Sequence, residues 1–270
     1  MRGVRAVLAA IALLAPAAPA LAWGRAAHDA VTSRAIDTLP KPLKAYYKEH
    51  RLELPSLSVE ATAVDEGTER RFAIDRLLPF PFEELPKSES AFKARFGEEG
   101  VKIGRLPWLV QEAHGRLVEA FRSGDKARIL QESDTLSGLV ADLHNPLALT
   151  DNADGQKTGQ HGLWVRFSTR LPEAMEKRLK LDPDAARFLD DPRGYVQGMI
   201  RASYVWVDNL LYEEDLARRG KSGYTEIYYE DLAARAGGLL RDRLSRAAED
   251  VGSYWYTAWT DAGRPELLVK

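Results

Sequence analysis

The sequence predicts an all-α fold in one domain, and three observations support this prediction. Apolar residues recur with helical spacing in several long segments, most clearly in residues 225–262. No segment shows the alternation of apolar and polar residues that is typical of β-strands. The chain has 270 residues, of which 45% are hydrophobic, and a chain of this size can bury a substantial core.

The first 22 residues have the organisation of a secretory signal peptide. Two arginines near the start form a positive region, residues 7–14 are apolar, and residues 20–22 (Ala-Leu-Ala) match a small-residue cleavage site. We therefore expect an exported protein, periplasmic or secreted, whose mature domain spans residues 23–270. Removal of the signal changes the net charge from −2 to −4. This mild acidity gives no electrostatic reason to expect strong attraction to nucleic acid or membranes.

The chain contains no cysteine, so an exported form relies on packing or bound metals rather than on disulfides. After residue 22, no apolar run is long enough to span a bilayer, and no transmembrane segment is expected. The sequence does not indicate an oligomeric state.

The first half of the mature chain is expected to contain four helices. The first spans residues 26–38 and ends at a Leu-Pro pair, and the second spans residues 42–50, with its proline in the first turn. Residues 55–88 contain several prolines and are expected to form turns and loops. Two long periodic segments follow at 106–123 and 126–145, and a proline ends the second.

The second half is expected to begin with a loop and to continue with three helices. Residues 150–162 are polar and rich in glycine, and such a loop is expected to border a cleft. Helices are expected over 163–181, 193–219 and 225–262. The last helix is expected to face the core through a stripe of eight residues: Leu232, Leu239, Leu240, Leu244, Ala247, Val251, Trp255 and Trp259.

Five segments, in this order, resemble the family of zinc-dependent bacterial phospholipases C and single-strand-specific zinc nucleases. Residues 23–28 (WGRAAH) are similar to the mature W-G-x-x-x-H opening of the family, and residues 63–75 resemble its A-D-E…H-x-I-D stretch. Residues 139–148 (LVADLHNPLA) resemble H-x-x-x-D-x-x-Q-P-L-H. The loop at 151–160 and the end at 255–265 are similar to those of bacterial members. The resemblance implies an all-α bundle with a cleft near the mature N-terminus.

The resemblance also implies a zinc centre that hydrolyses phosphate esters through metal-bound water. In the family, three zinc ions are held partly by the new N-terminal residue, whose α-amine has a pKa of about 7.7–8.0 and can donate a lone pair when neutral. Carried over residue by residue, Trp23, His28 and Asp142 match the first zinc site completely. Asp65, together with Asp142, matches part of the second.

The other five ligand positions of the family lack an effective zinc donor in this chain. Phe72 and Gly138 stand at the two histidine positions of the second site, and Ala148, Trp164 and Ser168 stand at the third. The side chains of Phe, Gly and Ala carry no donor atom, Trp offers only an N–H, and a serine hydroxyl is a poor zinc ligand. We therefore expect one or two zinc ions at most, and no zinc is also consistent with this pattern.

Two functions remain open at this point. The first is an exported, non-catalytic binding or accessory protein with at most one metal, whose ligand is a phosphate ester such as nucleic acid or a phospholipid head group. The second is a metal-dependent phosphoric ester hydrolase with a reduced centre, in which Asp65 and Asp142 serve catalysis. Arg166 and Trp164 are the candidate substrate-binding residues. Arg166 can hold a phosphate or form a salt bridge, and Trp164 can stack on a base or fill the former metal cavity.

Two residues at the end of the 126–145 helix are expected to face opposite ways. Asp142 lies among apolar neighbours and needs a partner if buried, which a metal, an arginine or backbone N–H groups can supply. His144 follows two residues later, so a regular helix turns it about 160° away from Asp142.

Overall fold

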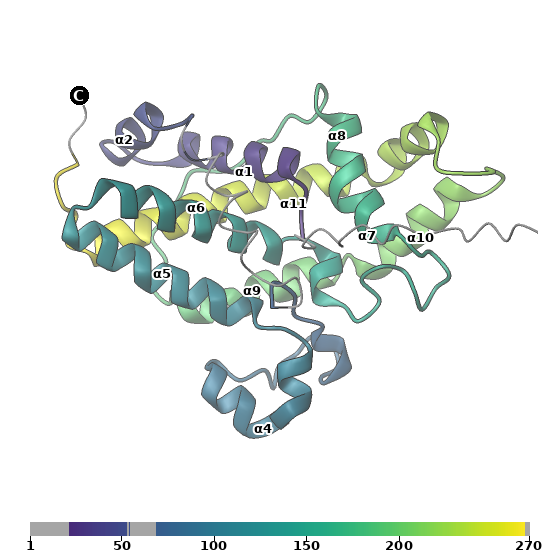
Figure 1. Ribbon diagram of the computed structural model, residues 1–270, viewed down its shortest axis with the longest axis horizontal. Helices are drawn as coiled ribbons and strands as arrows, with labels where there is room; N and C mark the ends of the chain where they lie inside the picture. The colour runs from purple at the N-terminus through teal and green to yellow at the C-terminus, as the bar shows by residue number, and fades with distance from the viewer. Residues whose placement is uncertain (1–21, 53, 55–68, 268–270) are drawn as a thin grey trace, which may run out of the picture.

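The centre of the fold consists of four helices: α1 (Arg25–Thr38), α5 (Leu106–Ser123), α6 (Lys126–Leu143) and α11 (Glu226–Asp261). The computed structural model describes residues 22–52, 54 and 69–267. Helix α11 runs along most of the molecule, with α1 and α6 in front of it, and α4 lies in a lobe below the bundle (Figure 1). The described residues form helices and contain no β-strand, which confirms the all-α prediction.

Shorter helices connect and cover this centre. None of the helices in the described part of the chain is long and apolar enough to cross a membrane. The remaining elements are α2 (Leu43–Glu49), η1 (Ile74–Arg76), α4 (Glu89–Lys102), η2 (Pro146–Leu149), α7 (Leu163–Val165), the π-helical η3 (Arg166–Arg170), α8 (Leu171–Met175), α9 (Pro192–Tyr204) and α10 (Val207–Arg218).

The long helices begin and end at residues with defined capping roles. The Asp125 side chain accepts a hydrogen bond from the backbone N–H of Arg128 at 3.1 Å and caps α6. Asp191 caps α9 in the same way through Gly194, at 2.9 Å. Gly124 ends α5 with a left-handed φ of 67°, which a glycine adopts without steric cost. These caps leave only a two-residue connection between α5 and α6.

The helix boundaries agree with the sequence in most of the bundle and differ in three places. Helix α4 was not expected, and its only non-helical backbone angles are at Gly97. The helix expected over 193–219 breaks at residues 205–206 into α9 and α10. The segment expected to be helical over 163–181 ends at Met175 and contains a π-helical turn.

The π-helical turn of η3 has a local cause. Pro172 has no backbone N–H, so it cannot donate the usual i→i−4 hydrogen bond to the carbonyl of Ser168. That carbonyl instead accepts a hydrogen bond from the backbone N–H of Gly24, at 2.9 Å. The backbone of Gly24 is therefore hydrogen-bonded to a carbonyl that has no donor within the helix. The helix is wider at this turn, as π-helical turns are, and such turns often occur at functional or inserted positions.

The core follows the apolar stripe of α11, and all eight predicted residues are buried. Trp255 illustrates the packing. Its indole stacks on Tyr47 of α2 with ring centroids 4.5 Å apart, and its Nε1 donates to the Ser133 carbonyl at 3.0 Å. The stripe therefore joins α2, α6 and α11, and its tryptophans need no functional explanation.

A glycine on α11 allows the close approach of α1. A Cβ atom at Gly252 would lie 2.0 Å from Thr38 Oγ1 and 3.2 Å from the Ala35 carbonyl oxygen. Gly238 lies on the exposed side of the same helix, and a Cβ there would meet no atom within 4 Å.

We expect Gly252→Ala to lower the free energy of unfolding by about 1–3 kcal/mol, because the added methyl group overpacks the α1–α11 contact. Urea denaturation monitored by circular dichroism measures the change. The control is Gly238→Ala, which should raise stability by up to about 1 kcal/mol through helix propensity. The same sign for both substitutions would contradict the packing argument.

Candidate functional site

Asp142, His28 and Arg70 form a buried charged group at the end of α6. The Asp142 carboxylate is completely buried, and Arg70 is only 4% exposed. Two nitrogens of Arg70 contact the same oxygen of Asp142. Nε lies 2.7 Å from Oδ2, and one terminal nitrogen lies 2.5 Å from it. His28, in the first turn of α1, places its Nε2 3.2 Å from the other oxygen, Oδ1. A buried carboxylate is costly unless a cation accompanies it, and here an arginine does so.

Gly138 provides the room for that arginine. It lies four residues before Asp142, so both face the same side of α6. A Cβ at Gly138 would be 3.0 Å from a terminal nitrogen of Arg70 and 3.8 Å from Cε1 of His28. The position at which the resemblance implies a zinc-binding histidine therefore lacks a side chain, and the Arg70 guanidinium lies against the space that a side chain would take.

The pair of His28 and Asp142 fits one zinc ion on the side away from Arg70. His28 Nε2 and Asp142 Oδ1 have no hydrogen-bond partner among the described residues, although they are 3.2 Å apart. Two ligands at about 2.0–2.2 Å from one tetrahedral zinc lie roughly 3.3–3.6 Å apart, slightly more than this separation. Asp142 Oδ2 is already bound to Arg70. The described part of the chain contains no group of three His, Cys, Asp or Glu residues that could hold a metal.

Trp23 is buried beside this group. Its indole Nε1 donates to the Ala141 carbonyl at 2.8 Å, and its ring lies 5.5 Å from that of Phe167. The preceding carbonyl, of Ala22, accepts a hydrogen bond from the Asn145 side chain. The backbone at Trp23 is thus held against the end of α6 near Asp142. Its nitrogen is bonded to Ala22 in this chain, and signal cleavage would convert it to an α-amine. The other predicted ligand, Asp65, lies outside the described residues.

The substituted ligand positions also lie in the interior. The Phe72 backbone N–H donates to the Ala148 carbonyl at 2.7 Å, and both side chains are completely buried. The Phe72 ring packs at 5.4 Å from Phe92. Ser168 is completely buried, and its hydroxyl accepts a hydrogen bond from Asn145 Nδ2 at 2.9 Å. These positions are occupied by packed side chains and protein hydrogen bonds.

Arg166 is held by protein acceptors on all three guanidinium nitrogens. Glu214 of α10 accepts from it at 2.8 and 3.1 Å, and the carbonyl oxygens of Gln160 and His161 accept at 2.9 and 2.6 Å. Burial lowers the pKa of Arg166, but nearby Tyr228 and Glu214 together raise it above its usual value. Arg166 thus anchors the glycine-rich loop to α10, and a role in binding substrate stays a prediction.

Trp164 is 9% exposed, and the Arg71 guanidinium lies 5.5 Å from its ring centroid. Its backbone N–H donates to the Asp154 carboxylate at 3.2 Å. A base-stacking platform needs an open ring face, whereas this ring is almost entirely covered. The geometry therefore favours the interpretation in which Trp164 fills space in the interior.

No family model matches this chain, and no curated protein matches it significantly.

Sequence reasoning did not single out two residues that the structure places here, Arg70 and Asn145. The signal for Arg70 was the requirement that a buried Asp142 have a positive or N–H partner, together with the two arginines before Phe72. Asn145 ends the predicted 126–145 helix, and in the structure its amide donates to both Ala22 and Ser168. His144 points away from Asp142 and pairs with Asp250 of α11 at 2.9 Å, as the helical period predicts.

We expect Arg70→Met to lower the free energy of unfolding by about 3–5 kcal/mol, because it leaves the Asp142 carboxylate buried without its cation. Urea denaturation without added metal measures the loss.

Two controls separate this effect from lost packing. The double variant Arg70→Met with Asp142→Leu removes both charges and should recover most of the loss, since no unpaired charge remains. Arg170→Met breaks an exposed pair with Glu173 and should change stability by less than about 1 kcal/mol. A double variant as unstable as Arg70→Met alone would contradict the ion-pair argument.

Proposed function

We propose that this chain is an exported, non-catalytic member of the zinc-dependent phospholipase C and nuclease family that binds a phosphate ester and holds at most one metal. One observation carries the proposal. The Arg70 guanidinium binds Asp142 Oδ2 through two nitrogens and lies against the vacant side-chain position of Gly138. A protein cation therefore takes the side of the carboxylate on which the resemblance implies a second zinc.

The arrangement of the matched segments supports the family assignment. Segments far apart in the sequence meet around the end of α6. His28 of α1 lies against Asp142, the Gly24 N–H donates to Ser168, and the Phe72 N–H donates to Ala148. All of these are positions at which the resemblance implies ligands or their immediate neighbours. Such a meeting is expected if the chain has the family's topology, and unrelated helical chains would rarely produce it.

The same positions argue against family-type catalysis. Hydrolysis by clustered zinc requires several ions that generate hydroxide and offset the charge on the phosphoryl oxygens. Phe72, Gly138 and Ala148 supply no side-chain donor, and the Ser168 hydroxyl is already hydrogen-bonded in the interior. A guanidinium that is already paired with Asp142 has little charge left to offer a phosphate. We therefore infer a binding or accessory role.

A reduced hydrolase is the second candidate, and one observation favours it. His28 Nε2 and Asp142 Oδ1 lie 3.2 Å apart with no hydrogen-bond partner among the described residues, which suits two ligands of one zinc. In this version Trp23, His28 and Asp142 hold the ion, with Asp65 beside it. The ion would supply an activated water. Arg70 would hold the Asp142 carboxylate in its orientation.

Metal content of the protein, exported and cleaved so that Trp23 is its N-terminus, tests the proposal. We expect no more than one zinc per chain by mass spectrometry, and we expect Asp142→Ala to lose it. With added zinc, hydrolysis of bis(p-nitrophenyl) phosphate should not exceed that of Asp142→Ala. Hydrolysis well above this background, in preparations of equal foldedness, would overturn the non-catalytic role and establish the reduced hydrolase.

A gain-of-site variant tests the part of Arg70 separately. Arg70→Ala combined with Gly138→His removes the guanidinium and adds an imidazole four residues before Asp142, on the same helix face. We expect this variant to bind more zinc per chain than the parent in equilibrium dialysis. The control is Gly115→His, which adds an imidazole to α5 at an open position. An equal gain from the control would show that the added histidine alone binds zinc.

A further inference from the structure

The start of α9 and the end of α11 meet on α5, and a histidine lies where they meet. The side chain of His114, on α5, is 12% exposed, and its ring packs edge-to-face against Tyr254 of α11 at 5.7 Å. The Tyr254 hydroxyl donates to the carbonyl of Pro192, the first residue of α9, at 2.7 Å. Gln111 donates to the next carbonyl, that of Arg193, at 3.5 Å. These five residues form what we call the His114 joint.

The His114 joint encloses unfilled space. A cavity of about 220 Å³ is lined by its five residues together with Gly115 and Asp261. One water occupies about 30 Å³, so the cavity can take several waters. Gly115 leaves one wall open, since a Cβ there would meet no atom within 4 Å. Water can therefore reach the ring of His114 after a small separation of the three helices.

Two charged groups face the ring from the neighbouring helices: the carboxylate of Asp261 at the end of α11 and the guanidinium of Arg193 at the start of α9. His114 Nε2 is buried and has no hydrogen-bond partner among the described residues. Asp261 Oδ2 lies 3.9 Å from it, beyond the usual hydrogen-bond distance of about 2.7–3.2 Å. A proton on Nε2 would therefore be buried without a hydrogen-bonded anion and beside a cation.

Burial is the largest effect on the protonation of this ring. It lowers the pKa of His114, Asp261 raises it, and Arg193 lowers it, so that the pKa lies below its ordinary value. Tyr254 also faces the ring, and burial raises the pKa of its hydroxyl well above its usual value, so the hydroxyl stays neutral. The folded chain thus favours the neutral form of His114.

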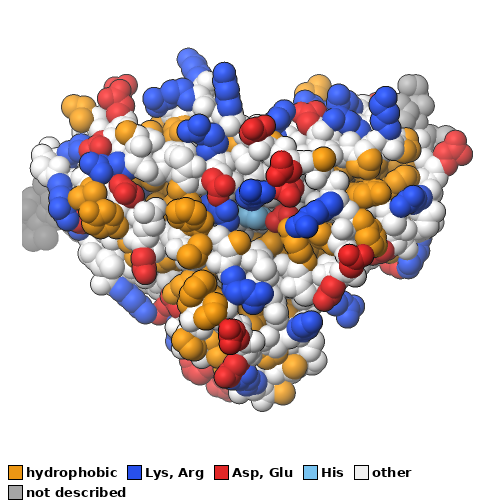
Figure 2. All heavy atoms as spheres, turned by 180° about the vertical axis from the view of Figure 1, so that it is seen from behind, with side chains coloured by type: hydrophobic (Ala, Val, Ile, Leu, Met, Phe, Trp, Pro, Cys, Tyr) orange, Lys and Arg blue, Asp and Glu red, His pale blue; other side chains and the backbone are white. Residues whose placement is uncertain are grey.

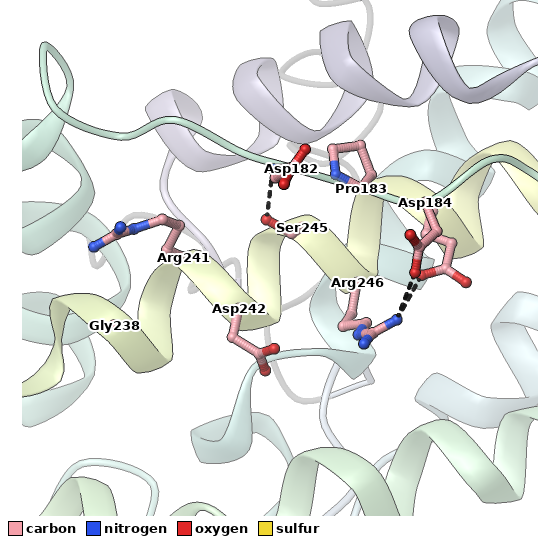
Figure 3. Close-up of a pocket in the computed structure, with 9 residues that line it drawn as sticks. Asp182, Pro183, Asp184, Gly238, Arg241, Asp242, Ser245 and Arg246 are labelled. Carbon is pink, nitrogen blue, oxygen red and sulfur yellow. Dashed lines mark hydrogen bonds and ion pairs between the residues drawn. The ribbon is translucent and has the colours of Figure 1, made fainter.

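The exposed charges elsewhere on the molecule are arranged differently. Figure 2 shows acidic and basic side chains interspersed over one face, with only a small area of histidine. The hollow of about 300 Å³ in Figure 3 has charged walls, but its Arg246 pairs with Asp184 and Glu249, and none of its lining residues is a histidine. Histidine is the side chain whose ordinary pKa lies between pH 5 and 8, so that hollow has no comparable titration.

The sign of the pH effect follows from the two states of the chain. In the unfolded chain the ring is hydrated and takes up a proton near the ordinary histidine pKa of about 6.5. Because the folded chain holds this proton less tightly, the contribution of His114 to stability is present above that pH and is lost as the pH falls below it. Acid therefore favours a state in which the ring meets water.

We propose that the His114 joint is an acid-sensitive switch that is closed when His114 is neutral and opens when His114 is protonated. In the closed state the start of α9 is held against α5 and α11. In the open state water enters the cavity. The Asp261 side chain is 38% exposed and free to turn, so its carboxylate moves to within hydrogen-bond distance of the ring. Opening loosens the first turns of α9 and the last turn of α11.

The first turns of α9 also border another cavity, which gives the switch a consequence. Tyr195 donates to Asp250 of α11 at 2.7 Å and, with Gly198 and Met199, lines a cavity of about 200 Å³. Release of α9 at Pro192 lets these residues move away from α11. The access to this cavity is therefore expected to depend on pH.

NMR titration of the histidine rings in the full mature chain, from about pH 8 to about pH 5, tests the protonation step. We expect His114 to titrate below the ordinary value of about 6.5. Arg193→Gln should raise its pKa and Asp261→Asn should lower it, because each removes one charge that acts on the ring. A His114 pKa at or above the ordinary value, or the opposite order in the two variants, would overturn the proposal.

Hydrogen exchange at about pH 7.5 and about pH 5.5, corrected for intrinsic rates, tests the opening. We expect the start of α9 and the last turn of α11 to lose protection roughly threefold or more at the lower pH. The control His161→Gln, at an exposed histidine, should show the same loss. His114→Gln should show none, and Arg193→Gln, at an exposed residue, should show a smaller loss even if His114→Gln does not fold. An undiminished loss in these two variants, or a loss spread evenly over the molecule, would contradict the switch.

Discussion

The burial of the Asp142 carboxylate is the constraint on which the centre of this molecule depends. A carboxylate removed from water loses several kcal/mol of hydration, so the chain must bring a positive partner to it. Arg70, in the segment before η1, is that partner, while His28 at the start of α1 lies 3.2 Å from the other oxygen and Asp142 itself lies near the end of α6. The ion pair therefore ties three distant parts of the sequence together, and the surrounding apolar packing is arranged around it.

An arginine and a zinc ion satisfy this carboxylate in ways that differ in their consequences. The Arg70 guanidinium is monovalent, remains in place, and donates along fixed directions to one oxygen. A zinc ion is divalent and leaves coordination positions for water or substrate. An arginine thus satisfies a buried carboxylate without offering the open coordination positions that a zinc ion offers. The absence of a side chain at Gly138 leaves room for this guanidinium, since a Cβ there would lie 3.0 Å from one of its nitrogens.

The sequence was sufficient to predict the parts of the fold that depend on periodicity. The stripe of α11 and the ends of α5 follow from apolar spacing and from a glycine at a left-handed position, both of which are local properties. The break between α9 and α10, the whole of α4, and the π-helical turn at η3 were not predicted. Pro172 is a local reason for the π-helical turn, because it cannot donate to the Ser168 carbonyl. The partner that this carbonyl finds instead, Gly24, is far away in sequence, and no local pattern indicates it.

The candidate site shows the same division. The residue types in the ordered motifs were sufficient to suggest which positions would meet, and His28 does lie against Asp142. The partner on the other oxygen could be given only as a class, because a sequence states that a buried carboxylate needs a cation but not which arginine reaches it. Arg70 and Arg71 are adjacent, and only one of them contacts Asp142. Which of the two arginines contacts Asp142 depends on how the chain packs around the next residue, Phe72, whose backbone N–H donates to the Ala148 carbonyl. That packing is a tertiary property.

The end of α6 carries two polar clusters because Asp142 and His144 face opposite sides of one helical turn. Asp142 is paired with Arg70, whereas His144 shares Asp250 with Tyr195 and lines a cavity of about 200 Å³. The contacts that hold Asp142 and those that hold His144 use no common side chain. One turn at the end of α6 therefore joins two polar groups whose partners come from different parts of the chain: Arg70 before η1 on one side, and Asp250 of α11 with Tyr195 of α9 on the other.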